Sequence, residues 1–196
     1  DDDWLSEVRL RVQVRDALSS IQIEGNSLTF ETAFELSRQR PDRALRDSER
    51  EFLNYLAAFD AIDSLRGERD YPLRSSDLRS IHRLLVEGVR GGERYAGQFR
   101  RESVAVGDVG DEGTVVHHQP PPWSEVEGHI DVLLEWVEEA KRKVSTAQVA
   151  KGVEDRWTHP VVVAGILQHR LVWIHPFLDG NGRSARMFTA MLMYQR

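Results

Sequence analysis

Residues 175–186 read His-Pro-Phe-Leu-Asp-Gly-Asn-Gly-Arg-Ser-Ala-Arg. These twelve residues hold a base, a carboxylate, a Gly-Asn-Gly turn and two arginines, which are nearly all the parts that a protein needs to handle a nucleoside triphosphate. His175 lies just before the turn, where an imidazole with an ordinary pKa of about 6.5 can take a proton from a hydroxyl nucleophile. Asp179 supplies the hard carboxylate oxygen that suits Mg²⁺ when it bridges phosphates. The spacing therefore predicts a nucleotide-processing site centred on this stretch.

The Gly-Asn-Gly turn is suited to binding an anion. Gly180 and Gly182 free the backbone to turn its N–H groups toward phosphate oxygens. Residues 183–194 are predicted to form a helix, so the turn would lie at a helix N-terminus, which attracts anions. Asn-Gly is also common in ordinary turns, but the carboxylate before it and the arginines after it favour a phosphate cradle.

The two arginines of the stretch, Arg183 and Arg186, are three positions apart and can both project from the first turn of that helix. As a pair beside the turn they can donate charge-assisted hydrogen bonds to β- and γ-phosphate oxygens. On an exposed helix face the same two arginines would need no function, so the prediction depends on their place beside the turn.

The stretch resembles the signature of the Fic family, HPFx(D/E)GNGRxxR, at every fixed position. The resemblance implies a protein adenylyltransferase, which moves AMP from ATP to a Ser, Thr or Tyr hydroxyl of a target protein and releases pyrophosphate. It implies His175 as the catalytic base, Asp179 as the Mg²⁺ ligand and Arg186 as the holder of the γ-phosphate. Gly182 stands where the kinase-like branch of the family has Lys, which favours AMP transfer over phosphate transfer. The implied nucleotide-binding residues are Phe177, Gly180, Asn181, Gly182, Arg183 and Arg186.

A second pattern, Ser20-x-x-x-Glu24-Gly25, lies near the start of the chain. By itself it is a helix end, where a Glu is slightly unfavourable with the helix dipole. Fic proteins with the motif (S/T)xxxE(G/N) carry an inhibitory helix, and the resemblance implies that Glu24 pairs with Arg186 in the place of the γ-phosphate. The inhibitory helix, within residues 1–26, would then precede the catalytic core in the same chain, with Ser20 and Glu24 as its inhibitory residues.

Two other interpretations of these residues stay open. Glu24 could instead position a water that removes AMP from a modified target, so that one residue would serve both inhibition and hydrolysis. The chain could also be a nucleotide-gated binding module, in which ATP occupancy switches the binding of a partner. The intact signature argues against the module, because a binder needs no base.

The rest of the chain is predicted to be mostly helical. The predicted helices cover residues 4–23, 29–40, 44–66, 77–89, 124–144, 160–174 and 183–194. Ser75 or Ser76 is expected to cap the fourth of them. Ser124 and Glu127 resemble a capping box for the fifth. Apolar residues recur at roughly helical spacing in the first, namely Leu5, Val8, Val12, Leu18 and Ile21.

One segment breaks the helical pattern. Val104-Ala105-Val106 and residues 114–118 are β-prone runs on either side of a Gly/Asp-rich turn at residues 107–113, which predicts a β-hairpin. The resemblance implies that this hairpin, about residues 101–119, is the flap of the family, which aligns a target segment by strand addition. The predicted fold class is therefore all-α, a Fic-fold helical bundle with a single β-hairpin flap.

Composition limits the class of protein. At 196 residues the chain is predicted to be one domain, residues 1–196. Its net charge of −6 argues against general binding to nucleic acid, which needs a basic surface. The absence of cysteine excludes disulfides and thiolate metal sites, and it is compatible with a reducing cytoplasm.

The longest apolar run, residues 161–167, is too short to span a bilayer, and no signal peptide is visible. The signature and the family resemblance imply ATP, Mg²⁺ and a target protein as partners. Composition adds the expectation of no membrane, no nucleic acid and a cytoplasmic location. The sequence predicts no oligomeric state. The chain does not begin with Met and stops inside an apolar helical run, so we expect further sequence beyond at least one end.

Overall fold

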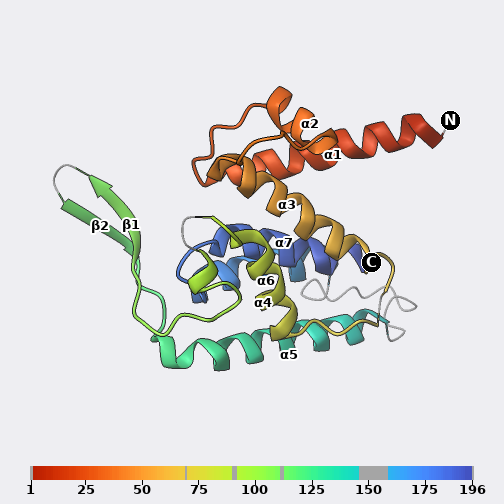
Figure 1. Ribbon diagram of the computed structural model, residues 1–196. Coiled ribbons are helices and arrows are strands. Elements are labelled where there is room, and N and C mark those ends of the chain that lie inside the picture. The colour runs from red at the N-terminus through yellow and green to blue at the C-terminus, as the bar shows by residue number, and fades with distance from the viewer. Residues whose placement is uncertain (1, 69, 90–91, 111–112, 146–158, 196) are drawn as a thin grey trace.

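The computed structural model describes residues 2–68, 70–89, 92–110, 113–145 and 159–195. This part of the chain forms seven α-helices and one antiparallel hairpin (Figure 1), which confirms the predicted all-α class with a single hairpin. Two short 3₁₀ turns, Gly92–Arg94 and Trp123–Glu125, lie between these elements. The elements are α1 (Asp2–Ile23), α2 (Phe30–Arg38), α3 (Asp47–Asp63), α4 (Ser75–Val86), β1 (Val106–Gly110), β2 (Gly113–His118), α5 (Val126–Ser145), α6 (Pro160–Ile174) and α7 (Asn181–Tyr194).

The last helix, α7, is the centre of the bundle. It packs against α6, α4, α3 and α1, and Figure 1 shows it between the α1–α3 group and α5. Nine of its 14 residues are buried, because apolar residues such as Met187, Phe188 and Leu192 face the neighbouring helices. Since α7 begins at Asn181, the signature stretch lies at the N-terminus of an enclosed helix, which holds it in place.

The first helix, α1, is helical as predicted, but part of its predicted buried face is exposed. Its C-terminal half buries an apolar stripe, and its N-terminal half extends past the rest of the bundle in Figure 1 and has little to pack against. The buried residues are Val14, Ala17, Leu18 and Ile21, at the spacing of one helix face. Leu5, Val8 and Val12, which were predicted on this face, are exposed.

The predicted caps of α4 and α5 are wrong. α4 begins at Ser75 with Arg74 as its N-cap residue, and the backbone N–H of Arg74 donates to the Asp77 carboxylate over 2.9 Å. A carboxylate at the third helical position can reach back to the free N–H groups of a helix start, which makes a serine cap unnecessary. Ser124 lies in a 3₁₀ turn, and α5 begins only at Val126.

The hairpin also departs from its predicted boundaries. Of the three residues predicted as its first strand, only Val106 lies in β1, and it pairs with His118. Gly107 was predicted in the turn, but it lies in β1 and pairs with Val116, and a Cβ atom there would come within 2.0 Å of the Val115 carbonyl oxygen. Gly107 therefore allows the two strands to approach closely. In the sequence, a glycine with this role looks the same as a glycine in a turn.

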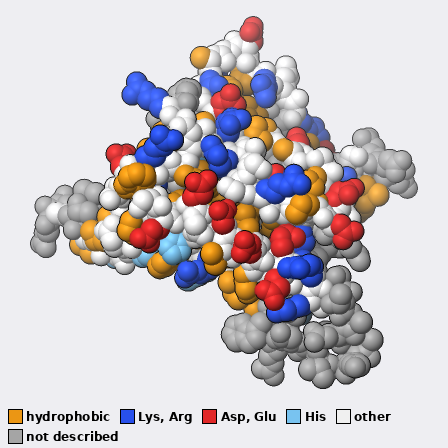
Figure 2. All heavy atoms as spheres, turned by 90° about the horizontal axis from the view of Figure 1, so that it is seen from below, with side chains coloured by type: hydrophobic (Ala, Val, Ile, Leu, Met, Phe, Trp, Pro, Cys, Tyr) orange, Lys and Arg blue, Asp and Glu red, His pale blue; other side chains and the backbone are white. Residues whose placement is uncertain are grey.

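Figure 2 shows the side of the molecule along which α5 runs. Acidic and basic side chains alternate over this face rather than forming a single-sign field. This face therefore lacks the continuous basic stripe that marks a nucleic-acid surface. Among the described residues, no helix combines the length and apolarity needed to cross a bilayer.

Candidate active site

His175 ends α6 in an unusual backbone conformation. It has φ 52° and ψ 61°, and among the described residues no other non-glycine residue has a positive φ. Its N–H donates to the Leu171 carbonyl over 3.0 Å, which closes the last turn of the helix. A left-handed conformation is unfavourable for a residue with a side chain, and such strain concentrates at functional sites. The chain therefore turns sharply after α6. The imidazole lies at the start of residues 175–180, which we call the signature loop.

The imidazole of His175 is suited to accept a proton. Its Nδ1 atom lies 3.4 Å from the Val172 carbonyl oxygen. Because a carbonyl can only accept a hydrogen bond, Nδ1 carries the proton and the Nε2 lone pair is available. Burial lowers the pKa of His175 from its ordinary value and Arg100 lowers it further, whereas Glu24 raises it. The ring is consequently neutral at pH 7, as a general base must be.

Phe177 and Asn181 fix the shape of the loop. The Asn181 side chain accepts a hydrogen bond from the Phe177 N–H over 2.8 Å and donates to the Phe177 carbonyl over 2.9 Å. The Phe177 ring is fully buried and stacks on His82, with ring centroids 3.7 Å apart. The Asn181 side chain is buried and hydrogen-bonded within the loop, and the Phe177 ring anchors the loop in the core. The predicted role of both residues in nucleotide binding stays a prediction.

His82 of α4 supports the same loop and was not predicted to have a role. Its Nδ1 accepts a hydrogen bond from the Gly97 N–H over 2.9 Å, so the proton is on Nε2, which donates to the Asp179 carbonyl over 3.1 Å. Burial lowers the pKa of His82 to about 4, so the ring is neutral. His82 and Asp179 are 97 positions apart, and the contact joins a side chain to a backbone atom, so no residue spacing signals it.

The carboxylate of Asp179 lies at the N-terminus of α7. Its Oδ1 accepts a hydrogen bond from the Gly180 N–H over 2.6 Å, and its Oδ2 lies 3.5 Å from an Arg183 nitrogen. The side chain is 43% exposed, so it can take a ligand from solvent. Gly180 has φ 71°, and a Cβ atom there would lie 2.9 Å from a Val86 methyl group, so the tight turn requires glycine.

The donor set around Asp179 fits Mg²⁺ rather than a metal held entirely by protein. Among the described residues, no group of three or more His, Cys, Asp or Glu could hold a metal ion. Mg²⁺ is commonly bound through one or two carboxylates and completed by phosphate oxygens and water. A single exposed carboxylate beside an anion-binding helix end is compatible with that mode of binding.

Arg183 is buried between two carboxylates. It is 3% exposed, and its nitrogens lie 3.5 Å from Glu51 of α3 and 3.5 Å from Asp179. Its Nε and Nη1 atoms donate no hydrogen bond within the described residues. Glu51 also accepts a hydrogen bond from Asn26 over 2.8 Å, so the segment after α1 is connected to the signature helix.

Arg186, by contrast, faces α1. It donates to the Ser20 hydroxyl over 2.7 Å, to the Ser20 carbonyl over 3.0 Å and to the Glu24 carboxylate over 2.8 Å. A Cβ atom at Gly182 would lie 2.3 Å from the same Glu24 oxygen, so the carboxylate rests against the backbone at the start of α7. The structure therefore brings Ser20, Glu24 and Arg186 together across 162 positions of sequence.

The hairpin meets the bundle near His175. The His118 side chain of β2 donates from Nε2 to the Trp173 carbonyl over 2.8 Å, which fixes the end of the strand to α6 two residues before His175. Val104 and Ala105 were predicted in the target-docking strand, but they lie before β1. The Val104 carbonyl instead accepts a hydrogen bond from the Gln119 side chain over 2.8 Å, so it closes the base of the hairpin.

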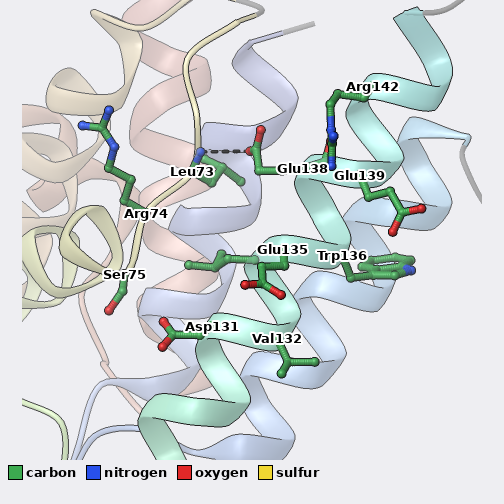
Figure 3. A pocket seen from close by; sticks show the side chains of 11 residues that line it. Leu73, Arg74, Ser75, Asp131, Val132, Glu135, Trp136, Glu138, Glu139 and Arg142 are labelled. Atoms are coloured by element: carbon green, nitrogen blue, oxygen red, sulfur yellow. Dashed lines mark hydrogen bonds between the residues drawn. The ribbon is translucent and has the colours of Figure 1, made fainter.

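A separate hollow lies between the N-terminus of α4 and α5 (Figure 3), and none of the signature residues line it. Glu138 accepts hydrogen bonds there from the Leu73 N–H over 3.0 Å and from Lys141 over 3.0 Å. Lys141 also donates to the Tyr71 carbonyl over 2.7 Å. These contacts hold the segment before α4 against α5, so Glu138 serves the fold at this hollow.

Comparisons with known proteins agree with the signature and the fold. A model of the Fic/DOC family matches residues 72–193. The chain is 27% identical over 175 residues to protein adenylyltransferase Fic of Nematostella vectensis, covering 87% of this chain and 35% of that protein. It is 29% identical over 180 residues to the protein of the same name from Drosophila virilis, covering 89% and 31%. The chain thus spans about a third of the length of these curated relatives.

Solved structures show the same fold. A Fic family protein from Desulfovibrio desulfuricans superposes with a TM-score of 0.69 at 25% identity, covering 94% of this chain and 48% of that one. A Fic domain containing signaling protein from Bacteroides thetaiotaomicron superposes with a TM-score of 0.75 at 20% identity, covering 100% and 67%, which supports the fold alone. Because the family match extends over more than half of the chain, this protein belongs to the Fic/DOC family.

Proposed function

We propose that this protein is a protein adenylyltransferase, which transfers AMP from ATP to a hydroxyl side chain of a target protein. The observation that carries the proposal is the neutral His175 with a free Nε2 lone pair, at the start of the loop that leads into the N-terminus of α7. A base beside an anion site is the arrangement that attack by a hydroxyl on a phosphate requires. The curated relatives named protein adenylyltransferase Fic support the same activity.

The reaction would use the residues in distinct roles. His175 takes the proton from the target hydroxyl as the hydroxyl oxygen forms a bond to the α-phosphorus of ATP, and the bond to pyrophosphate breaks on the opposite side. The N–H groups at the start of α7 bind phosphate oxygens. Asp179 would hold Mg²⁺, which neutralises charge on the leaving pyrophosphate. Arg183 lies within reach of Asp179 and adds positive charge to the same side of the site.

We further propose that α1 inhibits this activity. The Glu24 carboxylate forms an ion pair with Arg186 and lies against the backbone of Gly182, where the γ-phosphate would be bound. With Arg186 engaged, ATP lacks the contact that would turn its α-phosphate for in-line attack. A misplacement of reacting groups by about 1 Å can cost roughly 100-fold in rate, so the loss of this contact is enough to slow transfer strongly.

Labelled ATP tests both statements. The parent chain, Glu24→Gly and Glu24→Gly with His175→Ala are incubated with ATP labelled at the α-phosphate, with the protein itself and a cell lysate as acceptors. Label on protein is expected with Glu24→Gly, at a rate about 10- to 100-fold above the parent, since each 1.4 kcal/mol is roughly tenfold. The variant with both Glu24→Gly and His175→Ala should transfer no label. Absence of label with Glu24→Gly, while ATP binds, would reject transfer and favour the nucleotide-gated binding module.

A second candidate function is removal of AMP from a modified target. It is favoured by the position of the Glu24 carboxylate, which is close enough to His175 to raise the pKa of the imidazole. In this second proposal the Glu24 carboxylate would position the water that attacks the AMP-modified target. If this is the reaction in the cell, Glu24→Gly should slow the release of AMP from a target that was modified beforehand, whereas it should accelerate transfer.

A further inference from the structure

The side chain of Arg100 lies where the signature loop and the hairpin meet. It is 3% exposed, and its donors are directed at backbone carbonyls of both segments. Its hydrogen bonds run from Nε to His175 O over 2.8 Å, from Nη2 to Ile174 O over 3.4 Å, from Nη2 to Pro121 O over 2.6 Å and from Nη1 to Glu102 O over 3.0 Å. The backbone N–H of Arg100 donates in addition to the Pro176 carbonyl over 2.8 Å.

Two of these acceptors belong to the end of α6. The carbonyls of Ile174 and His175 have no partner within the helix, and they lie at the negative end of its dipole. A buried cation is stabilised there without a carboxylate, although burial lowers the pKa of the Arg100 guanidinium from its ordinary value. Arginine stays charged under these conditions, and its planar fork sets the relative position of the groups that it bonds.

The other two acceptors belong to the two ends of the hairpin. Glu102 precedes β1 and Pro121 follows β2, so one guanidinium group joins both chain segments that carry the hairpin. We call residues 102–106 and 118–121 the flap base. The bond from Gln119 to the Val104 carbonyl closes the flap base, and the bond from His118 to the Trp173 carbonyl ties it to α6.

We infer that Arg100 is a positioning residue that holds the left-handed turn at His175 and the flap base in one fixed relation. The inference rests on the proposed function, because it concerns the alignment of the base with a target hydroxyl that the hairpin presents. Arg100 does not touch the reacting atoms. It holds the carbonyl of the strained His175 residue, so the ring keeps one place relative to the strand. Without its guanidinium group, the two segments lose these shared contacts, and the remaining bond from His118 to the Trp173 carbonyl allows them to shift relative to each other.

Arg100→Lys and Arg100→Gln, both made with Glu24→Gly, test the inference. Lysine keeps the charge but replaces the planar fork by a single ammonium group, and glutamine keeps a planar donor without the charge. Arg79→Lys is the matched control, because Arg79 donates to the Gly97 carbonyl over 2.7 Å on the same segment without contacting His175. Self-labelling under single-turnover conditions, ATP affinity and amide hydrogen exchange are measured for each variant.

We expect labelling to fall about 10- to 100-fold in both Arg100 variants, as for a small misplacement of reacting groups, while ATP affinity stays unchanged. The rate of amide hydrogen exchange should rise in the flap base and also in residues 174–178. The rate in α3 should not change. Arg79→Lys should match the Glu24→Gly protein in all three measurements.

Exchange that rises throughout the molecule, or a variant that fails to fold, would show that Arg100 serves general stability and would overturn the inference. Exchange that rises in the flap base alone would overturn it as well, because the two segments would then not be coupled. If the Glu24→Gly protein itself transfers no label, the proposed function fails, and the exchange data still decide whether Arg100 joins the two segments.

Discussion

At the residue scale, His175 combines a strained backbone with a side chain that is kept neutral. The strain is compensated by bonds to its backbone, from its own N–H to Leu171 and from Arg100 to its carbonyl. These bonds leave the Nε2 atom of the imidazole for chemistry. The backbone hydrogen bonds of His175 therefore fix its position, and its imidazole ring is left to accept a proton.

The charge state of His175 predicts the pH dependence of transfer. Its pKa is lowered by burial, so the neutral base persists below the ordinary value of 6.5 and is lost only as pH falls through the lowered pKa. Glu24 raises this pKa, so Glu24→Gly lowers it further. The rate of the Glu24→Gly protein at saturating ATP should therefore be flat near neutral pH, with its acid limb below pH 6.5. An acid limb above that pH would contradict the assignment of His175 as the base.

At the scale of elements, α4 supports the signature loop through one neutral histidine. His82 stacks on Phe177 and bonds the Asp179 carbonyl, and it can do so only with its proton on Nε2. Protonation of Nδ1 would place a donor against the Gly97 N–H. The loop that carries the candidate metal ligand therefore depends on a buried group that resists ionisation.

The same residue predicts how stability depends on pH. The folded pKa of His82 is about 4, below the ordinary 6.5, so the unfolded chain binds more protons between these values. Its contribution to the free energy of unfolding is fully present above pH 6.5 and is lost as pH falls toward 4. The loss is roughly 3 kcal/mol at most, since each pKa unit is about 1.4 kcal/mol. Denaturant unfolding of the parent and of His82→Gln should show a shallower pH dependence for the variant. Parallel curves would contradict this prediction.

The hairpin gives a prediction of its own. A side chain at Gly107 would meet the Val115 carbonyl, so Gly107→Ala should disturb the pairing of β1 with β2. Labelling of targets by the Glu24→Gly protein should then fall while ATP affinity is retained. Gly128→Ala is the matched control, because a Cβ atom there meets nothing within 4 Å and alanine favours the helix. Unchanged labelling with Gly107→Ala would argue that the hairpin has no part in presenting the target.

The elements that the sequence predicted well are those whose signal is local. The helices follow from apolar periodicity, and the signature loop follows from twelve adjacent residues. The first strand was misplaced because Gly107 has the composition of a turn but serves the close approach of two strands. His82 and Arg100 were missed as supports of the loop because their acceptors are backbone carbonyls far away in the chain. Every residue has a backbone carbonyl, so the sequence does not indicate which one accepts the hydrogen bond.

At the scale of the whole molecule, the first and last helices share one site. Glu24 directly follows α1, Arg186 lies in α7, and the contact between them joins two parts of the chain that are 162 positions apart. Asn26 and Glu51 connect the segment after α1 to Arg183 in the same way. The same contacts therefore hold the N-terminal helix against the proposed phosphate site at the start of α7.

This arrangement predicts how the protein discriminates between ATP and ADP. In the parent chain Arg186 is bonded to Glu24 and Ser20, so the γ-phosphate gains no arginine contact and the two nucleotides should bind with similar affinity. Glu24→Gly frees Arg186 for the γ-phosphate. A hydrogen bond to a charged group contributes about 1.5–3 kcal/mol, so ATP should then bind roughly 10- to 100-fold more tightly than ADP.

Titration calorimetry with Mg²⁺ and each nucleotide measures this ratio. Combining Glu24→Gly with Arg186→Ala should return the ratio to that of the parent, because the released arginine makes the contact. Asp16→Asn is a suitable control, since Asp16 lies on α1 near Arg186 without an ion pair described between them. A parent chain that already prefers ATP strongly would show that Arg186 reaches the γ-phosphate with Glu24 in place, and inhibition by competition for this arginine would then be wrong.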